Sequence, residues 1–180
     1  RCADVTGVQT CALPISGDSS INLRTGSHIH HPQHGLGKIE SIGKRSFSGA
    51  KAETYMQVFF EREELTLIAR ADEITQEIRK PISATEAREL LDGISSWNEK
   101  VKTQWKARAD THQSALDSGD PEACAKVFKN LSRLESEGKL RQADRNHLKH
   151  ALEMLTDELS RALGKRRSQA RRLIMDAAGA

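Results

Sequence analysis

The stretch Ile78-Arg79-Lys80-Pro81-Ile82-Ser83-Ala84-Thr85-Glu86 divides the chain into two halves with different sequence patterns. Before it, short β-branched and aromatic runs alternate with glycines, whereas after it apolar residues recur every three to four positions. Ser83 and Glu86 have the spacing of a capping box, which starts a helix. We therefore expect an α+β protein whose strands occupy residues 21–80 and whose helices occupy residues 83–164.

The first half contains four runs that are typical of strands, at residues 27–31, 37–42, 54–60 and 65–68. Glycines and a charged run separate them, as in small all-β modules. A module of about sixty residues buries little surface by itself and gains stability by docking on a neighbour. The pattern predicts a small antiparallel β-barrel or curled sheet.

The second half contains further helix starts. Ser96 with Glu99 has the spacing of a second capping box, and Asp120 followed by Pro121 suits a cap and a first helical position. A fourth apolar stripe runs through residues 142–163 and stops at a glycine. Four helices with one apolar face each predict an all-α helical bundle.

Residues 5–15 correspond to codons that resemble the end of a sequencing-library adaptor. We therefore expect residues 1–20 to be a non-native or disordered segment, excluded from the fold. Cys124 is the one cysteine outside that segment, so no internal disulfide is expected, and the chain suits a reducing cytoplasm. No run of about 18 apolar residues occurs, so no membrane span is expected. A cytoplasmic monomer is the expected form.

Charge is mildly positive, with 28 basic and 25 acidic side chains. This excess permits contact with nucleic acid without requiring it. Five basic residues and one acidic residue fall within residues 165–176. We expect residues 165–180 to be a basic C-terminal tail, either bound to phosphate or simply solvated, and the sequence does not decide between the two.

The sequence offers little for catalysis. Four histidines, at positions 28, 30, 31 and 34, cluster near the first strand, but no carboxylate or thiol lies beside them in sequence. Gly35 and Gly37 lack the third glycine of a dinucleotide loop and fit a tight turn better. No nucleophile and base stand at matched spacing. We expect no enzyme activity, no cofactor and no metal site.

Two tryptophans, Trp97 and Trp105, stand among the cations Lys100, Lys102, Lys106 and Arg108. An exposed aromatic side chain flanked by cations suits a wedge between base pairs of DNA. Periodicity gives Trp105 a second interpretation, because Trp105, Ala109, His112 and Leu116 share one helix face and would form an ordinary core stripe. Trp97 is expected to pack against the start of a helix or between domains.

Several stretches together resemble the CarD/CdnL family of bacterial transcription regulators, from about residue 24 to residue 163. The first is His31-Pro32-Gln33-His34-Gly35-Leu36-Gly37-Lys38-Ile39, which resembles the opening strand and turn of that family. The others are Leu65-Thr66-Leu67, Ile78-Arg79, Pro81-Ile82-Ser83, Trp105-Lys106-Ala107-Arg108, Leu116-Asp117-Ser118-Gly119-Asp120, Val127, Leu131 and Asp157-Glu158-Leu159.

The resemblance implies a Tudor-like N-terminal domain that docks on the β subunit of RNA polymerase, and a helical domain that contacts promoter DNA. It implies that Trp105 wedges into the minor groove at the upstream edge of the transcription bubble. The residues that would contact phosphates are Lys102, Lys106 and Arg108, and those facing the polymerase are Lys44, Arg45 and Ile68. Asp110 stands where some relatives carry a cation.

From these residues we expect a regulator that stabilises the promoter open complex without reading base sequence. The alternative is a protein–protein adaptor that docks on RNA polymerase and never contacts DNA. Trp105 separates the two hypotheses, since it is exposed in the first and buried in the second.

Overall fold

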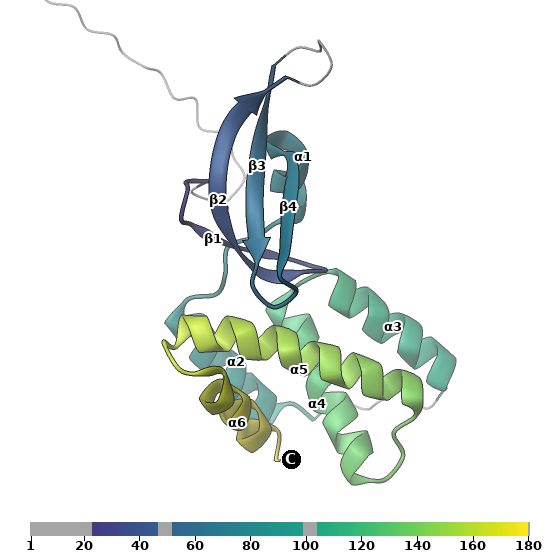
Figure 1. The fold of residues 1–180 in the computed structure, drawn as a ribbon. Helices are drawn as coiled ribbons and strands as arrows, with labels where there is room; N and C mark the ends of the chain where they lie inside the picture. The colour runs from purple at the N-terminus through teal and green to yellow at the C-terminus, as the bar shows by residue number, and fades with distance from the viewer. Residues whose placement is uncertain (1–22, 47–51, 99–103, 180) are drawn as a thin grey trace, which may run out of the picture.

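The computed structural model describes residues 23–46, 52–98 and 104–179. Within these ranges a four-stranded antiparallel sheet precedes six helices, so the expected α+β class is confirmed (Figure 1). The predicted non-native segment, residues 1–20, lies outside the described residues. So does Lys102. None of the helices in the described part of the chain is long and apolar enough to cross a membrane.

The four predicted strands are present, and each pairs with its neighbour in the order β1-β2-β3-β4. Their bounds are β1 His28–His31, β2 Gly35–Arg45, β3 Glu53–Phe60 and β4 Leu65–Arg70. Among the described residues β1 and β4 form the two edges, so the sheet is open and the closed barrel is not observed. The turn predicted at Gly35 and Gly37 lies just before them, and both glycines belong to β2.

A short helix that the sequence pattern did not indicate, α1 Ala71–Glu77, covers one face of the sheet. Buried side chains alternate along β3, where Met56, Val58 and Phe60 point to this face. Ile74 of α1 is 2% exposed and packs on the same cluster. The sheet half therefore has a small core of its own.

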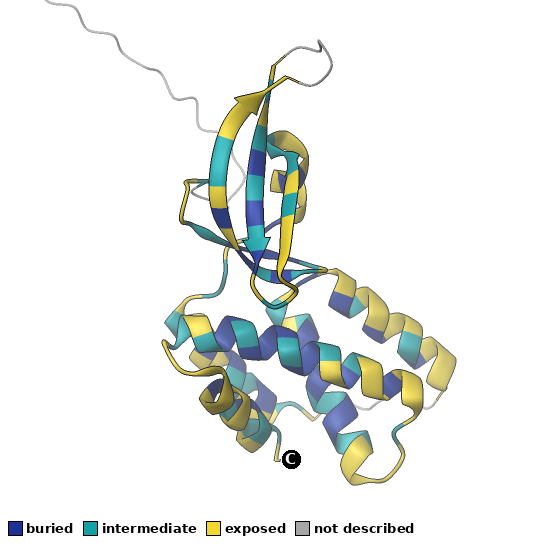
Figure 2. Ribbon diagram, viewed as in Figure 1, coloured by how far each residue is buried: buried dark blue, intermediate teal, exposed yellow. Residues whose placement is uncertain are grey.

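The helical half has a separate and larger core. Its helices are α2 Ala84–Ser96, α3 Trp105–Asp117, α4 Pro121–Ser136, α5 Gln142–Ala162 and α6 Arg167–Ala178. Helix α5 lies in the middle and is buried over much of its length (Figure 2). Apolar side chains that recur every three to four residues on α4 and α5 fill this core, as their pattern predicts.

The helix starts agree with the sequence at two of three places. Ser83 Oγ accepts a hydrogen bond from the Glu86 backbone N–H, and Glu86 accepts one from Ser83 at 2.7 Å, which completes the capping box. Asp120 accepts from the Ala123 N–H at 2.8 Å at the start of α4. The start predicted at Ser96 is wrong, because Ser96 is the last residue of α2.

The predicted basic tail is mostly a folded helix. Residues Arg167–Ala178 form α6, and Ala170 and Ile174 on its apolar face are fully buried. This helix packs against α2 and α5. The helical half therefore has one more helix than the four expected, and the charges of the segment are displayed on its outer side.

Candidate nucleic-acid interface

Trp105 is the first residue of α3, and its side chain is 49% exposed. His112 and Leu116, on the face predicted for the core, are buried. Side chains on a helix point back toward its N-terminus, so a residue at position one projects past the end of the packed stripe. The core interpretation of Trp105 is therefore wrong, and the exposure that the wedge hypothesis requires is present.

Helices α3 and α5 begin side by side, at the right of the molecule in Figure 1. Arg141, the residue before α5, places its guanidinium carbon 5.5 Å from the centre of the Trp105 ring. A cation above the face of an indole is attracted by the negative ring face. The sequence pattern missed Arg141, because 36 positions separate it from Trp105 and no local motif connects them.

Arg108, one turn after Trp105 on α3, is only 6% exposed. Its Nη2 atom donates to Oδ2 of Asp144 at 2.6 Å, and its Nε atom donates to Oδ1 at 3.2 Å. Burial favours the neutral acid, but the hydrogen bond and charge of Arg108 hold the pKa of Asp144 below its usual range. The guanidinium is committed to Asp144, so the structure does not support the expected contact with a phosphate.

Lys106 is the predicted phosphate partner that remains available, because its side chain is exposed next to Trp105. Asp110, one turn further along α3, is also exposed and places a negative charge near this edge. Arg141, the residue before α5, adds a second exposed cation. We define the Trp105 edge as Trp105, Lys106 and Arg141.

Trp97 has a different environment. It follows the last residue of α2 and packs against the helical core. A Cβ atom on Gly93 would lie 2.5 Å from the indole ring, so the small residue one turn earlier makes room for it. Lys126 of α4 lies 5.5 Å from the ring centre. Trp97 therefore packs within the bundle and not between the two halves.

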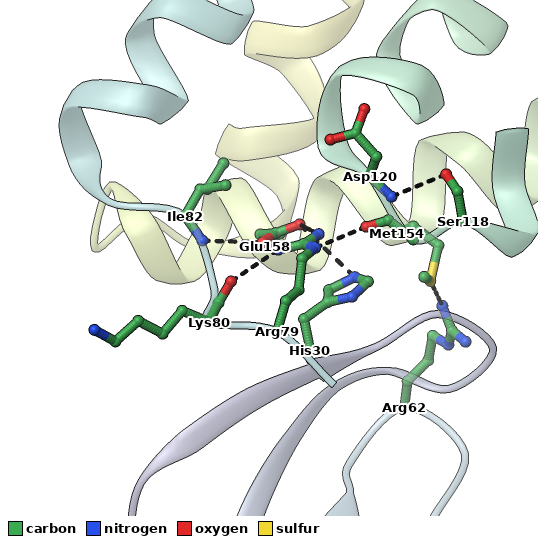
Figure 3. A network of polar contacts seen from close by, with 10 residues as sticks. His30, Arg62, Arg79, Lys80, Ile82, Ser118, Asp120, Met154 and Glu158 are labelled. Atoms are coloured by element: carbon green, nitrogen blue, oxygen red, sulfur yellow. Dashed lines mark hydrogen bonds and ion pairs between the residues drawn. The ribbon is translucent and has the colours of Figure 1, made fainter. Parts of the chain in front are cut away.

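The two halves meet at Glu158 of α5, which is 2% exposed. Its carboxylate accepts hydrogen bonds from the Arg79 guanidinium at 2.5 and 2.8 Å and from the Ile82 backbone N–H at 3.0 Å (Figure 3). His30 Nε2 lies 3.7 Å from the same carboxylate. Arg79 also donates to the carbonyl oxygen of Gly119 at 2.7 Å. These contacts join β1, the connection between the halves, the α3–α4 turn and α5.

Backbone contacts reinforce this junction. His30 and Arg79 exchange two backbone hydrogen bonds, at 2.8 and 2.9 Å. Gly119 has a φ of +64°, and a Cβ atom there would lie 2.9 Å from the Cα atom of Pro32. The predicted helix break is thus one place where the bundle touches the sheet half, at the end of α3 opposite Trp105. A carboxylate such as Glu158 within an apolar stripe is the signal by which the sequence could have indicated this junction.

Comparison with known proteins identifies the helical half. Residues 89–175 match the family described as "CarD, C-terminal domain". The chain is CarD-like. It is 25% identical over 138 residues to the "Putative transcription factor YdeB" of Bacillus subtilis (strain 168), and the match covers 76% of this chain and 90% of that relative. These similarities indicate a role in transcription regulation.

The matched range changes one expectation. It extends through most of α6 to residue 175, whereas the resemblance drawn from motifs stopped at residue 163. In this CarD-like protein the basic segment is therefore part of the helical domain and not an appendage to it.

Two of the three residues expected to face a polymerase, Lys44 and Arg45, lie at one end of the sheet of the CarD-like chain. Lys44 and Arg45 are exposed at the end of β2. Ile68 is 46% exposed on β4, the edge strand. Arg45 pairs in register with Glu53, whose carboxylate lies 3.2 Å from Arg70 of β4. Lys44 and Arg45 therefore lie at one end of the sheet, whereas Ile68 pairs with Gln57 in the middle of β4.

The histidine cluster of the CarD-like chain does not converge on one point. Burial lowers the pKa of His30 to about 4. His31 and His34 have ring centres 4.9 Å apart, and each contacts a separate carboxylate, Glu77 at 3.3 Å and Glu63 at 2.8 Å respectively. In the described ranges no group of three or more histidine, cysteine or acidic side chains is arranged to hold a metal ion.

Proposed function

We propose that this CarD-like protein is a non-enzymatic transcription regulator that binds the β subunit of RNA polymerase and stabilises the promoter open complex. The observation that carries the proposal is the exposure of Trp105, at 49%, on a rigid base. The buried Arg108–Asp144 pair ties α3 to α5 directly beneath it. A large aromatic side chain that is held firmly and left exposed is suited to contact a partner.

In the proposed mechanism Trp105 inserts from the minor groove at the upstream edge of the bubble, where base pairs are already partly unstacked. Insertion of an apolar side chain stabilises the distorted step. Lys106 and Arg141 are exposed beside it and supply charge for phosphates, which position a protein on DNA without reading sequence. Arg141 leaves the indole face when the ring is inserted and moves to the adjoining phosphate.

The sheet half supplies the proposed docking site for polymerase. The β4 strand is an edge, and its exposed apolar residues are Leu65 and Ile68, at 36% and 46%. An edge strand with exposed apolar side chains is a template for pairing with another chain. Lys44 and Arg45, which pair with the start of β3, would add charge further along the sheet. Docking raises the local concentration of the weak DNA site near the promoter.

The test is the lifetime of the open complex formed by RNA polymerase on a promoter fragment, measured with the full chain after addition of a competitor. We expect Trp105→Ala to shorten the extended lifetime about 10-fold, since stacking on an aromatic residue is worth about 1–3 kcal/mol. Trp105→Phe should keep part of the effect. Ser114→Ala, an exposed change on the same helix, is the matched control.

The same experiment separates the alternative adaptor function. Ile68→Glu is expected to abolish polymerase binding in both cases. If Trp105→Ala binds polymerase and gives the wild-type lifetime, the protein acts through protein contacts alone and the wedge is rejected. If Trp105→Ala folds, binds polymerase and loses the effect on lifetime, the adaptor hypothesis is rejected.

A further inference from the structure

The positive charge of the chain is concentrated in one segment. Residues 165–176 contain five basic side chains and one acidic side chain, while residues 1–164 contain 23 basic and 24 acidic ones. The whole net charge of +3 therefore comes from α6 and the two residues before it. The Trp105 edge does not contain this charge, and the proposed wedge makes no use of it.

The structure displays this charge on one exposed surface. Ala170 and Ile174 face the core, and Lys165, Arg166, Arg171 and Arg172 are exposed on the other side. We call these four cations the α6 basic face. Among the described residues no carboxylate lies within ion-pair distance of any of the four, whereas neighbouring Arg167 pairs with Asp157 at 2.7 Å.

The basic face is hollowed and not flat. Lys165, Arg166 and Arg172 line a shallow depression of about 420 Å³ together with Ser168 and Gln169. Cations and hydrogen-bond donors gathered around an open hollow suit the oxygens of a phosphate, which accept charge-assisted hydrogen bonds.

The basic face is continuous with the exposed side of α5. Arg145, Lys149, Glu153 and Thr156 follow at intervals of four, four and three residues, so they lie on one face of that helix. Thr156 lines a small hollow with Arg167 and Arg171, which shows that α6 covers the later part of the face that Arg145 and Lys149 occupy earlier. Two exposed cations, Arg145 and Lys149, thus lie between the Trp105 edge and α6, and the carboxylate of Glu153 lies 3.9 Å from Lys149 on the same face.

The distance between the Trp105 edge and the α6 basic face bears on the size of a ligand that contacts both. From residue 141 to residue 161, α5 is about 30 Å long at 1.5 Å per residue. A duplex with a rise of about 3.4 Å per base pair covers that length in about nine base pairs. A small phosphorylated molecule cannot span it, and a regular row of phosphates can.

We propose that the α6 basic face is a second, sequence-independent binding surface for the phosphate backbone of duplex DNA, at the opposite end of α5 from Trp105. It holds the duplex beside the bubble while Trp105 contacts the distorted step. The identity of the duplex as promoter DNA rests on the proposed function, but the affinity of the surface for a DNA backbone does not.

The test uses the full chain without polymerase and a labelled 30-base-pair duplex of arbitrary sequence, with affinity measured by fluorescence anisotropy over a range of salt concentrations. Three glutamines in place of Arg166, Arg171 and Arg172 remove the charge and keep a high helix propensity. We expect affinity at low salt to fall about 10-fold to 100-fold, and the slope of log affinity against log salt to shrink by about two to three.

The matched control removes three exposed cations elsewhere, at Arg24, Lys80 and Arg88, and has the same net charge. It should bind the duplex nearly as the wild type does. Equal losses in the two triple variants would show that only overall charge matters, and would overturn the proposal. Circular dichroism must show the same helix content in all three proteins.

Two further measurements keep the proposals separate. Vesicles containing a phosphatidylserine and phosphatidylcholine mixture replace the duplex in the same buffer. Binding to vesicles in place of DNA would overturn the assignment of duplex DNA as the partner. Trp105→Ala should lower the affinity for the plain duplex less than the α6 triple variant does. If it loses all duplex affinity while the α6 triple variant keeps it, the α6 surface is rejected and the Trp105 edge alone binds DNA.

Discussion

In the described part of the chain, Asp144 and Glu158 are buried carboxylates that each pair with an arginine, and the two pairs join different elements. Arg108 and Asp144 join α3 to α5 inside the helical half, directly beneath Trp105. Arg79 and Glu158 join the sheet half to the helical half, and Glu158 also accepts from Ile82. The first pair fixes the helices that carry the exposed Trp105. The second pair fixes the position of the sheet half relative to the helical half.

The comparison shows that the importance of a buried ion pair depends on which elements it connects. A buried pair adds little net stability over an apolar replacement, because desolvation of both charges offsets their attraction. Removing only one of the two charged side chains lowers stability strongly, because the remaining charge is left without a partner. The expected damage should therefore scale with the number of groups that lose their partner at each site.

The largest effect is expected at the junction. Glu158→Ala leaves the Arg79 guanidinium without its carboxylate partner and the Ile82 N–H without its acceptor. We expect the free energy of unfolding to fall by about 3–5 kcal/mol, and protease cleavage near residues 79–82 to become faster. Urea unfolding followed by circular dichroism measures the first effect.

Glu153→Ala is the matched control for that change, since Glu153 lies on the same helix and its carboxylate is 3.9 Å from its partner, Lys149. It should cost less than about 0.5 kcal/mol. A cost for Glu158→Ala no larger than that of Glu153→Ala would contradict the role given to the junction.

A smaller loss of stability is expected when the Arg108–Asp144 pair is changed. Asp144→Asn keeps the shape of the side chain and one hydrogen bond to Arg108, but it removes the charge. We expect a loss of about 2 kcal/mol in unfolding experiments, with a change in tryptophan fluorescence as α3 shifts. Asp110→Asn, on the exposed side of α3, is the control. If both changes lower the free energy of unfolding equally, the role given to the Arg108–Asp144 pair is rejected.

Acid should act on the junction through His30. Burial lowers the pKa of this histidine to about 4, while an unfolded histidine has a pKa near about 6.5. As pH falls through this interval the unfolded chain takes up the proton first, so the free energy of unfolding decreases. We expect His30 to account for about 2 kcal/mol of lost stability between about pH 7 and pH 5.

His30→Gln measures this contribution, because it removes the titrating group and leaves the other histidines in place. The variant should show a flatter dependence of unfolding free energy on pH, whatever its absolute stability. An unchanged slope between neutral pH and pH 5 would show that His30 is not the titrating group.

The smallest effect on stability is expected for Trp105→Ala, which removes a half-exposed ring and its contact with Arg141. We expect less than about 1 kcal/mol. Trp97→Ala removes a ring that packs on the helical core and should cost roughly 2–3 kcal/mol. Thermal unfolding of both variants checks the order, and a reversed order would show that Trp105 is a structural residue.

Much of the fold follows from local patterns. Strand alternation, the Ser83 capping box and the cap at Asp120 depend on residues close together in sequence, and all three are found in the structure. The closed barrel was not observed, because closure depends on how two distant strand edges meet. Helix α1 has seven residues, which is too short for a periodic pattern to stand out.

The placement of two side chains on α3, Trp105 in a core stripe and Arg108 on the surface, was wrong for a different reason. Two stripes on α3 have helical spacing, one beginning at Trp105 and one at Arg108, and they share His112 and Leu116. The buried set is Arg108, His112 and Leu116. A pattern based on polarity places Arg108 on the surface because arginine is charged. The pattern cannot show that Arg108 has a buried partner, Asp144, since the two residues are 36 positions apart in the chain.

The basic segment was misjudged for a related reason. Four arginines among residues 166–172 make the sequence look solvated, and only the spacing of Ala170 and Ile174 shows an apolar side. A small residue such as alanine contributes little to an apolar pattern, although it allows close packing of two helices. The charge of α6 was therefore predicted from sequence, and its fixed display on a folded surface was not.

The junction at Glu158 also determines a distance. Arg79 holds the sheet half and the α3–α4 turn at once, so the sheet end that carries Arg45 and the helix end that carries Trp105 are kept at one separation. A protein anchored on polymerase at the first end would reach DNA at a constant number of base pairs from the enzyme. Promoters of unrelated sequence would then be contacted at the same position, because a fixed distance within the protein, and not a base sequence, would select the site.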